Sequence, residues 1–171
     1  MPKNIVLVGF MGVGKSSVGR VLARRLGYRF IDTDQAIEKI TGLTVEMIFR
    51  RHGAIRFRSE ETLLLQRLLG QSGLVISTGG GMLLKEENVR LLRQNGILIG
   101  LRAEPEIIIE RVGNKKDRPL LKKNNVAENV HKLLKEREGV YDVAEFTVDT
   151  GLFSPEESVN EIIKYLREKG Y

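Results

Sequence analysis

Cysteine and tryptophan are both absent from this chain of 171 residues, and only two histidines occur. Without cysteine there are no disulfides, thiolate metal sites or cysteine nucleophiles, and two histidines are too few for a histidine-rich metal site. No apolar run reaches the roughly 18 residues that a membrane-spanning helix needs. The N-terminal residues lead directly into a strand-like run and lack the pattern of a signal peptide. We therefore expect a cytoplasmic protein that does not span a membrane.

Internal repeats and proline-rich linkers are missing as well, and the length predicts a single domain over residues 1–171. The formal net charge is +6, and residues 113–139 contribute much of it with eight basic and four acidic side chains. A basic segment of this kind suits nucleic acid, a membrane surface or a small anionic ligand. Composition alone leaves these three alternatives open.

Short apolar runs alternate along the chain with segments of helical periodicity. The runs predict strands at 5–8, 29–31, 74–77, 97–101 and 146–148. The periodic segments predict helices near 15–26, 35–40, 44–70, 85–95, 104–112, 126–144 and 155–169. This alternation predicts an α/β fold, with a parallel sheet covered by helices on both faces. Because ligands bind beyond the carboxyl ends of the strands in such sheets, functional residues are expected there.

The first predicted strand is followed by Gly-x4-Gly-Lys-Ser at residues 9–16, and then by a predicted helix. In such a loop, backbone N–H groups turn inward around phosphate oxygens, and the helix directs its positive end at the same anion. Lys15 would reach the terminal phosphates, and the Ser16 hydroxyl would bind Mg²⁺. The alternative, a glycine-rich turn without a ligand, is disfavoured by the flanking strand and helix. The predicted nucleotide contacts in this loop are Gly12, Val13, Gly14, Lys15, Ser16 and Ser17.

Two of the five aspartates in the chain, Asp32 and Asp34, follow the second predicted strand. Capping the next helix would require only one of them. Because no aspartate follows the third strand, Asp32 is the expected carboxylate near the metal ion, either directly or through water. Asp34 could orient an acceptor hydroxyl and take its proton.

Three consecutive glycines, Gly79 to Gly81, follow the third predicted strand. Glycines at such a point allow a ligand to approach the backbone, and a flexible loop is the alternative.

Arg137 falls on the apolar stripe of the predicted 126–144 helix, and Arg58 shares a helix face with Glu61. A buried guanidinium is costly unless it is paired. Each arginine therefore either forms a structural ion pair, such as Arg58 with Glu61, or holds a substrate carboxylate.

The segment from 113 to 125 has no clear periodicity and is long for a connection in a compact domain. This predicts a lid over the site, in which Arg118 could close over the phosphate being transferred. A solvated loop with exposed lysines is the alternative.

Taken together, these motifs resemble those of the shikimate kinase family. The matching segments are 9–16, Asp32-Thr33-Asp34, Phe57-Arg58-Ser59-Glu60-Glu61, Thr78-Gly79-Gly80-Gly81, Arg118-Pro119-Leu120-Leu121, and Arg137 with Tyr141 and Ala144. The resemblance implies a P-loop kinase fold like that of nucleoside monophosphate kinases, with five parallel strands in the order 2-3-1-4-5. It also implies transfer of the γ-phosphate of ATP to the 3-hydroxyl of shikimate, a step in aromatic amino acid biosynthesis.

The same resemblance implies roles for individual residues. Catalysis would rest on Lys15, Asp34 and Arg118, and Mg²⁺ would be the cofactor, bound by Ser16 and Asp32. Further contacts to ATP are implied for Arg111, Arg118 and the segment 151–155, where Phe153 stands in place of a polar or basic side chain. Contacts to shikimate are implied for Asp34, Arg58, Gly80, Gly81 and Arg137.

The expected organisation is a single P-loop kinase domain, with a substrate-binding helical segment at about 33–62 and a lid at about 113–125. The expected ligands are ATP, ADP and shikimate, and the protein is expected to be a monomer with neither a nucleic-acid nor a membrane partner. A gluconate-type kinase is the nearest alternative, but it should lack the triple glycine and the Phe-Arg-x-x-Glu run. A nucleotide-gated protein that binds nucleic acid is an alternative from another class, disfavoured by an aromatic content of 6%.

Overall fold

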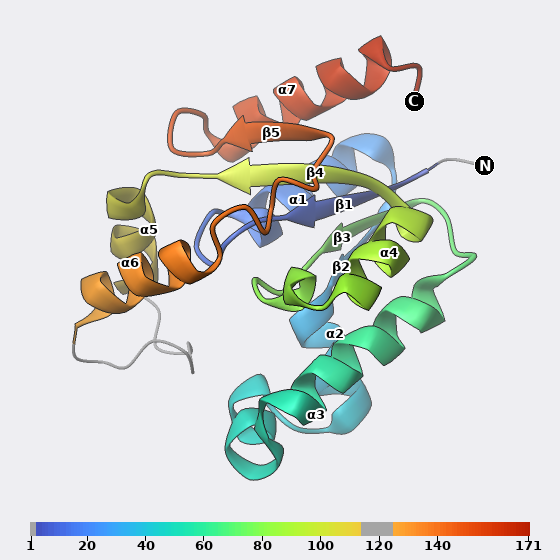
Figure 1. Cartoon of the computed structure of the whole chain (residues 1–171). Coiled ribbons are helices and arrows are strands. Elements are labelled where there is room, and N and C mark those ends of the chain that lie inside the picture. Colours follow the sequence, from blue (N-terminus) through green and yellow to red (C-terminus); the bar gives the residue numbers. More distant parts are fainter. Residues whose placement is uncertain (1–2, 114–124) are drawn as a thin grey trace.

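The computed structural model describes residues 3–113 and 125–171. In this part of the chain, five strands form one sheet in the order β2-β3-β1-β4-β5, and every neighbouring pair is parallel (Figure 1). The strands are β1 (Asn4–Val8), β2 (Arg29–Asp32), β3 (Leu74–Ser77), β4 (Gly96–Arg102) and β5 (Phe146–Asp149). Each boundary lies within one residue of its predicted position. The five predicted strands and their predicted order are therefore confirmed.

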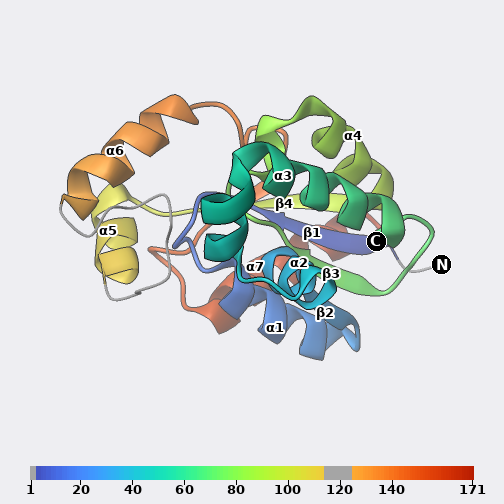
Figure 2. The same cartoon turned by 90° about the horizontal axis from the view of Figure 1, so that it is seen from below.

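The connections between strands are helical. The helices are α1 (Lys15–Leu26), α2 (Thr33–Thr41), α3 (Val45–Leu68), α4 (Glu86–Asn95), α5 (Pro105–Gly113), α6 (Val126–Glu136) and α7 (Pro155–Glu168), with a short 3₁₀ helix η1 (Met82–Leu84). Helices α1 and α7 cover one face of the sheet, and α3 and α4 cover the other (Figure 2). Helices α5 and α6 lie beyond the carboxyl ends of the strands (Figure 1).

Strand β1 is buried on both faces, which explains its unbroken apolar run. Ile5 and Leu7 belong to the core cluster that contains residues of α1 and α7. Val6 and Val8 belong to the cluster on the opposite face, with residues of α3 and α4. A parallel strand between two helical layers has no solvent face, so alternation with polar residues is not expected. The β1 carboxyl end, where the Gly-x4-Gly-Lys-Ser loop begins, is thereby held at the centre of the sheet.

The long helix predicted at 44–70 is bent at one residue. Gly53 has φ 79° and ψ 174°, values outside the helical region, so α3 consists of two helical pieces. The bend allows Phe49, from the first piece, and Phe57, from the second, to pack with ring centroids 4.9 Å apart. Both rings line the cleft described below.

The helix predicted at 126–144 is wrong in its second half. Helix α6 ends at Glu136, Arg137 is its C-cap, and Gly139 has φ +77°, a left-handed value that favours glycine over other residues. The chain then forms turns up to Ala144, whose N–H donates to the Tyr141 carbonyl at 3.2 Å. The predicted burial of Arg137 is nevertheless correct, because only 5% of this residue is exposed.

Helix α7 begins with a capping box, in which Ser154 accepts from the Glu157 N–H at 3.2 Å and Glu157 accepts from the Ser154 N–H at 2.8 Å. Most of the predicted lid, with Arg118, lies outside the described residues. No helix among the residues described is long and apolar enough to cross a membrane.

Candidate active site

The loop between β1 and α1 has the backbone conformation of a phosphate site. Gly12 and Gly14 have φ values of +78° and +92°, which only glycine adopts readily. Helix α1 starts at Lys15, and its N-terminus has neither a capping side chain nor an acidic residue in the first turn. The N–H groups of this turn therefore remain available to an anion, which the helix dipole also favours.

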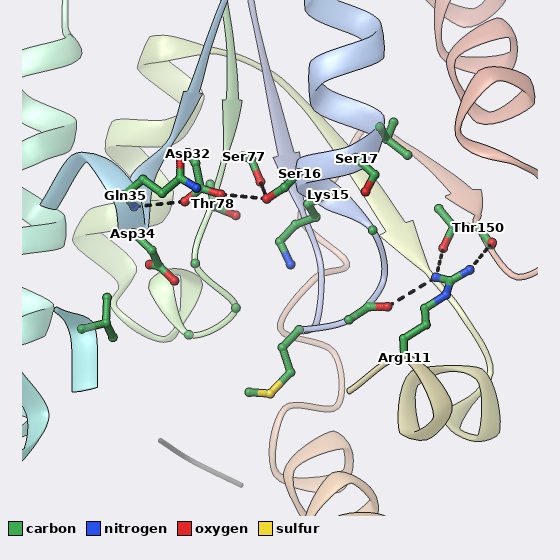
Figure 3. Close-up of a pocket in the computed structure, with 18 of the residues that line it drawn as sticks. Lys15, Ser16, Ser17, Asp32, Asp34, Gln35, Ser77, Thr78, Arg111 and Thr150 are labelled. Carbon is green, nitrogen blue, oxygen red and sulfur yellow. Dashed lines mark hydrogen bonds between the residues drawn. The ribbon is translucent and has the colours of Figure 1, made fainter. Parts of the chain in front are cut away.

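Lys15 lies against this loop with only 8% of its surface exposed. Its Nζ atom donates to the carbonyl oxygens of Gly9 and Phe10, both at 2.8 Å. These bonds hold the ammonium group at the loop, and Figure 3 shows the side chain extending from the start of α1 into the cleft. An ammonium held in this position suits the terminal phosphates of a nucleotide.

Ser16 and Asp32 meet beside the loop, although they come from different elements. The Ser16 hydroxyl donates to Asp32 Oδ2 at 2.7 Å, and Ser77 Oγ at the end of β3 lies 3.5 Å from Ser16 Oγ (Figure 3). Asp32 Oδ1 accepts from the Gln35 N–H at 3.2 Å and caps α2. Asp32 thus serves as a cap with one oxygen, while the other faces the Ser16 hydroxyl. These hard oxygen atoms fit Mg²⁺, which commonly takes one or two protein ligands besides phosphate and water.

A cleft of about 840 Å³ joins the regions that the sequence motifs identify. Of the predicted site residues in the described part of the chain, those lining it are Gly12, Gly14, Lys15, Ser16, Ser17, Asp32, Asp34, Arg58, Gly80, Gly81, Arg111 and Arg137. Val13 contributes its backbone to the loop, while its side chain is buried in the core. Phe153, which stands in place of the polar or basic side chain that the resemblance implies, also lines the cleft.

The triple glycine makes room for charged side chains from other elements. A methyl group on Gly79 would lie 2.8 Å from Asp34 Oδ1 and 3.1 Å from Glu61 Oε1. A methyl group on Gly81 would lie within 3 Å of the Arg58 guanidinium. The loop therefore carries glycine because two carboxylates and a guanidinium pack directly against its backbone.

Arg58 combines the two alternatives that its sequence position left open. Its Nη1 atom lies 2.9 Å and 2.8 Å from the two oxygens of Glu61, so the i,i+3 ion pair is present. Its side chain is 22% exposed and also lines the cleft beside Gly81. The pairing through one nitrogen orients the guanidinium, and it remains available to an anionic ligand.

Arg137 is almost fully buried but differs from Arg58 in its surroundings. Its guanidinium carbon lies 5.6 Å from the centroid of the Phe10 ring. Its Nη1 atom is buried and has no hydrogen-bond partner within the described ranges. The same atom would lie 3.3 Å from a methyl group on Gly80. Arg137 therefore approaches the triple glycine at Gly80, whereas Arg58 approaches it at Gly81. A buried guanidinium nitrogen that lines a cleft is suited to an anionic ligand.

Glu61 lies between these groups and is fully buried. Burial, together with the smaller effect of the neighbouring Asp34 charge, raises the pKa of Glu61 to about 7 against the opposing effects of Arg58 and Arg137. Tyr141, next to this cluster, donates its hydroxyl hydrogen to the Gly80 carbonyl. Burial also raises the pKa of Tyr141 above its ordinary value of 10, so the phenol stays protonated at neutral pH.

Two residues of the cleft region, Tyr141 and Thr150, were not assigned a functional role from the sequence. Tyr141 was expected on a helix, and its contact to Gly80 depends on the turns after α6. Thr150, directly after β5, accepts from Arg111 Nη1 at 3.1 Å and lines the cleft (Figure 3). No motif surrounds Thr150, and its one signal is its position at the carboxyl end of a strand.

The phosphate loop, the strand order and the position of the cleft define the class of protein: this is a P-loop kinase. Comparison with known proteins then identifies the family. Residues 11–167 match the sequence model of a family described as "Shikimate kinase". A shikimate kinase from Pelotomaculum thermopropionicum is 62% identical over 169 residues, covering 99% of this chain and 98% of the relative. Another from Desulforudis audaxviator is 53% identical over 169 residues, covering 99% of this chain and 89% of the relative.

Solved structures agree with these sequence matches. The structure of shikimate kinase from Acinetobacter baumannii in complex with shikimate superimposes with a TM-score of 0.93 at 37% identity, covering 99% of this chain and 95% of the other. The chain belongs to the shikimate kinase family and is therefore an ATP-dependent kinase.

The buried carboxyl of Glu61 makes stability depend on pH. Because the pKa of Glu61 rises from 4.5 to about 7 on folding, the folded protein binds more protons than the unfolded chain between these values. The free energy of unfolding should therefore decrease as pH rises from 4.5 to 7. Glu61→Gln cannot titrate and should lack this decrease, as measured by urea unfolding at several pH values. Glu60→Gln, which removes a charge from the same helix, is the control, and parallel curves for wild type and Glu61→Gln would contradict the assignment.

Proposed function

We propose that this chain transfers the γ-phosphoryl group of ATP to the 3-hydroxyl of shikimate, producing shikimate 3-phosphate and ADP. The observation that carries the proposal is the pair of guanidiniums, Arg58 and Arg137, that approach the triple glycine in the same cleft as Asp34 and the phosphate loop. Shikimate offers a carboxylate to the guanidiniums and hydroxyls to Asp34. The resemblance to a relative solved with shikimate supports the same substrate.

Asp34 is the proposed proton acceptor. It lies in the first turn of α2 and lines the cleft, whereas Glu61 is fully buried and bonded to Arg58. The acceptor hydroxyl would transfer its proton to Asp34 as its oxygen bonds to the γ-phosphorus. The bond from that phosphorus to the β–γ bridging oxygen breaks, and ADP leaves with that electron pair. Asp34, which lines the cleft, is therefore the carboxylate that we assign to the substrate hydroxyl, whereas Glu61 pairs with Arg58.

The charge that develops on the transferred group requires cations around it. Lys15 at the phosphate loop is one proposed source, and Arg118, outside the described residues, is another. Mg²⁺ would be held by Ser16 and, through water, by Asp32. Ser16 Oγ and Asp32 Oδ2 lie 2.7 Å apart. When bound, the ion neutralises charge on the ATP phosphates.

The proposed organisation follows from where these residues lie. The helical segment at about 33–62 would bind shikimate, because it carries Asp34 and Arg58. The segment at about 113–125 would be the lid. We further propose a monomer that acts on ATP and shikimate without a nucleic-acid partner and that is located in the cytoplasm.

Acceptor-dependent release of ADP tests the proposed function most directly. Purified protein with Mg-ATP should form ADP when shikimate is added, and not with gluconate or without an acceptor. A coupled assay of ADP measures this. ADP release with gluconate but not with shikimate would establish the alternative kinase. Binding of ATP without release of ADP for either acceptor would refute the substrate assignment while retaining the nucleotide site.

Replacing Asp34 separates proton transfer from nucleotide binding. Asp34→Asn keeps the size of the side chain but removes the proton acceptor, so kcat should fall at least about 100-fold. The Kd for ATP should change by less than about twofold, since Asp34 does not belong to the phosphate loop. Asp142→Asn, in the turns after α6, is the matched control and should leave kcat unchanged. Full activity of Asp34→Asn would exclude it as the base.

Replacing Arg137 tests whether it binds the substrate carboxylate. Arg137→Met keeps the length of the side chain without its charge, and the KM for shikimate should rise by about 10- to 100-fold, as expected for lost charged hydrogen bonds. The KM for ATP should stay within about twofold. Lys132→Met removes the same charge from the exposed side of α6 and should change neither constant. An unchanged KM for shikimate, with a lower unfolding temperature, would give Arg137 a structural role instead.

A further inference from the structure

The direction of each N–H group in the phosphate loop depends on the other side of its peptide bond. A trans peptide is planar, and its carbonyl oxygen points opposite to its N–H hydrogen. An N–H group that faces a phosphate therefore has a carbonyl that faces into the protein. Whatever binds that carbonyl also sets the direction of the N–H group.

Two consecutive carbonyls of this loop have partners behind it. The Gly12 carbonyl, in the peptide that carries the Val13 N–H, accepts from Arg111 Nη1 at 3.3 Å. The Val13 carbonyl, in the peptide that carries the Gly14 N–H, accepts from the Thr150 hydroxyl at 2.6 Å. The second bond is the shorter one, and it joins the loop to the residue after β5.

The Val13–Gly14 peptide needs such a partner because its own backbone does not determine its orientation. Gly14 has φ +92°, and glycine adopts positive and negative φ with similar ease. Rotation of this peptide would turn the Gly14 N–H away from the phosphate site without a steric penalty at Gly14. A hydrogen bond on the Val13 carbonyl opposes that rotation.

Thr150 is itself held firmly. It is 5% exposed, and its N–H donates to the Arg102 carbonyl at the end of β4 at 2.9 Å. Arg111 donates to its carbonyl at 2.7 Å through Nη2 and to its hydroxyl at 3.1 Å through Nη1 (Figure 3). Since Arg111 donates to the hydroxyl oxygen, the single hydroxyl hydrogen is directed elsewhere. The Val13 carbonyl at 2.6 Å is a closer acceptor than the Arg102 carbonyl at 3.2 Å.

We propose that Thr150 is a positioning residue for phosphate binding, because its hydroxyl holds the Val13–Gly14 peptide with the Gly14 N–H directed at the nucleotide phosphates. The inference rests on the proposed function, since it requires ATP in this cleft. It assigns a role to the carboxyl end of β5, where Arg111 binds both Thr150 and the Gly12 carbonyl of the phosphate loop.

Three variants of the full-length protein test this role. Thr150→Val has nearly the same shape without the hydroxyl and leaves the Val13 carbonyl unsatisfied, so the Kd for ADP should rise about tenfold. Thr150→Ser retains the hydroxyl and should stay within about twofold of wild type. Thr147→Val makes the same change at an exposed position of β5 and should have no effect. The KM for shikimate should be unchanged in all three.

The Gly14 amide resonance provides a measurement that packing alone would not change. In wild type, ADP should shift the ¹H–¹⁵N signal of Gly14 strongly, because a charged oxygen accepts its hydrogen. Thr150→Val should lose most of this shift at saturating ADP, while Thr150→Ser should keep it. If Thr150→Val unfolds, Thr150→Ala, which also lacks the hydroxyl, takes its place.

The outcomes separate this inference from the proposed function. If wild type does not bind ADP, the proposed function fails first. If wild type binds ADP and Thr150→Val matches it in Kd and in the Gly14 shift, Thr150 has no positioning role. Equal losses in Thr150→Val and Thr150→Ser would also overturn the inference, because packing rather than the hydroxyl would then be responsible.

Discussion

The cost of burying charge governs the arrangement of side chains around the triple glycine. A guanidinium or carboxylate removed from water is tolerated only beside opposite charge or hydrogen-bond partners. Glu61, fully buried, supplies that partner to Arg58 at 2.8 Å, and burial in turn raises the pKa of Glu61. Arg137 is nearly as buried, yet its Nη1 atom has no hydrogen bond to any residue that the structure describes. Under the proposed function, a substrate carboxylate would supply the acceptor that this nitrogen lacks.

The parallel sheet makes this arrangement possible because it brings the ends of distant strands to one edge. β1 leads into the phosphate loop, β2 ends at Asp32, β3 leads into the triple glycine, and Thr150 follows β5. Because the three glycines have no side chains, charged groups from α2, α3 and the residues after α6 can approach the backbone of this loop. The sheet edge thus supplies rigid anchor points, and the loops and first helical turns that follow the strands carry many of the groups that would react or bind.

Features that depend on residues close together in the sequence were predicted better than features that depend on contacts between distant parts of the chain. The five strands were found because each carries a short apolar run, although only β1 and β3 are buried along their whole length. The 126–144 helix was wrong after Glu136, because Gly139 adopts a left-handed conformation that periodicity does not reveal. Arg58 could not be assigned to an ion pair or to the cleft, and the structure shows that it makes the ion pair and also lines the cleft. Its side-chain direction depends on Glu61 and Gly81, which only folding brings around it.

By itself, the sequence determined the features that rest on neighbouring residues: the phosphate loop at 9–16, the aspartate pair, the α/β class and, through the order of its motifs, the family. Such features arise from local backbone geometry and hydrophobic periodicity, which the order of residues specifies directly. The tertiary structure decided which side chains share the cleft, the burial of Glu61, and the contact of Thr150 with the Val13 carbonyl across 137 positions of the chain. These properties depend on distances between elements and on exclusion of water, and both exist only once the sheet and its helices have packed.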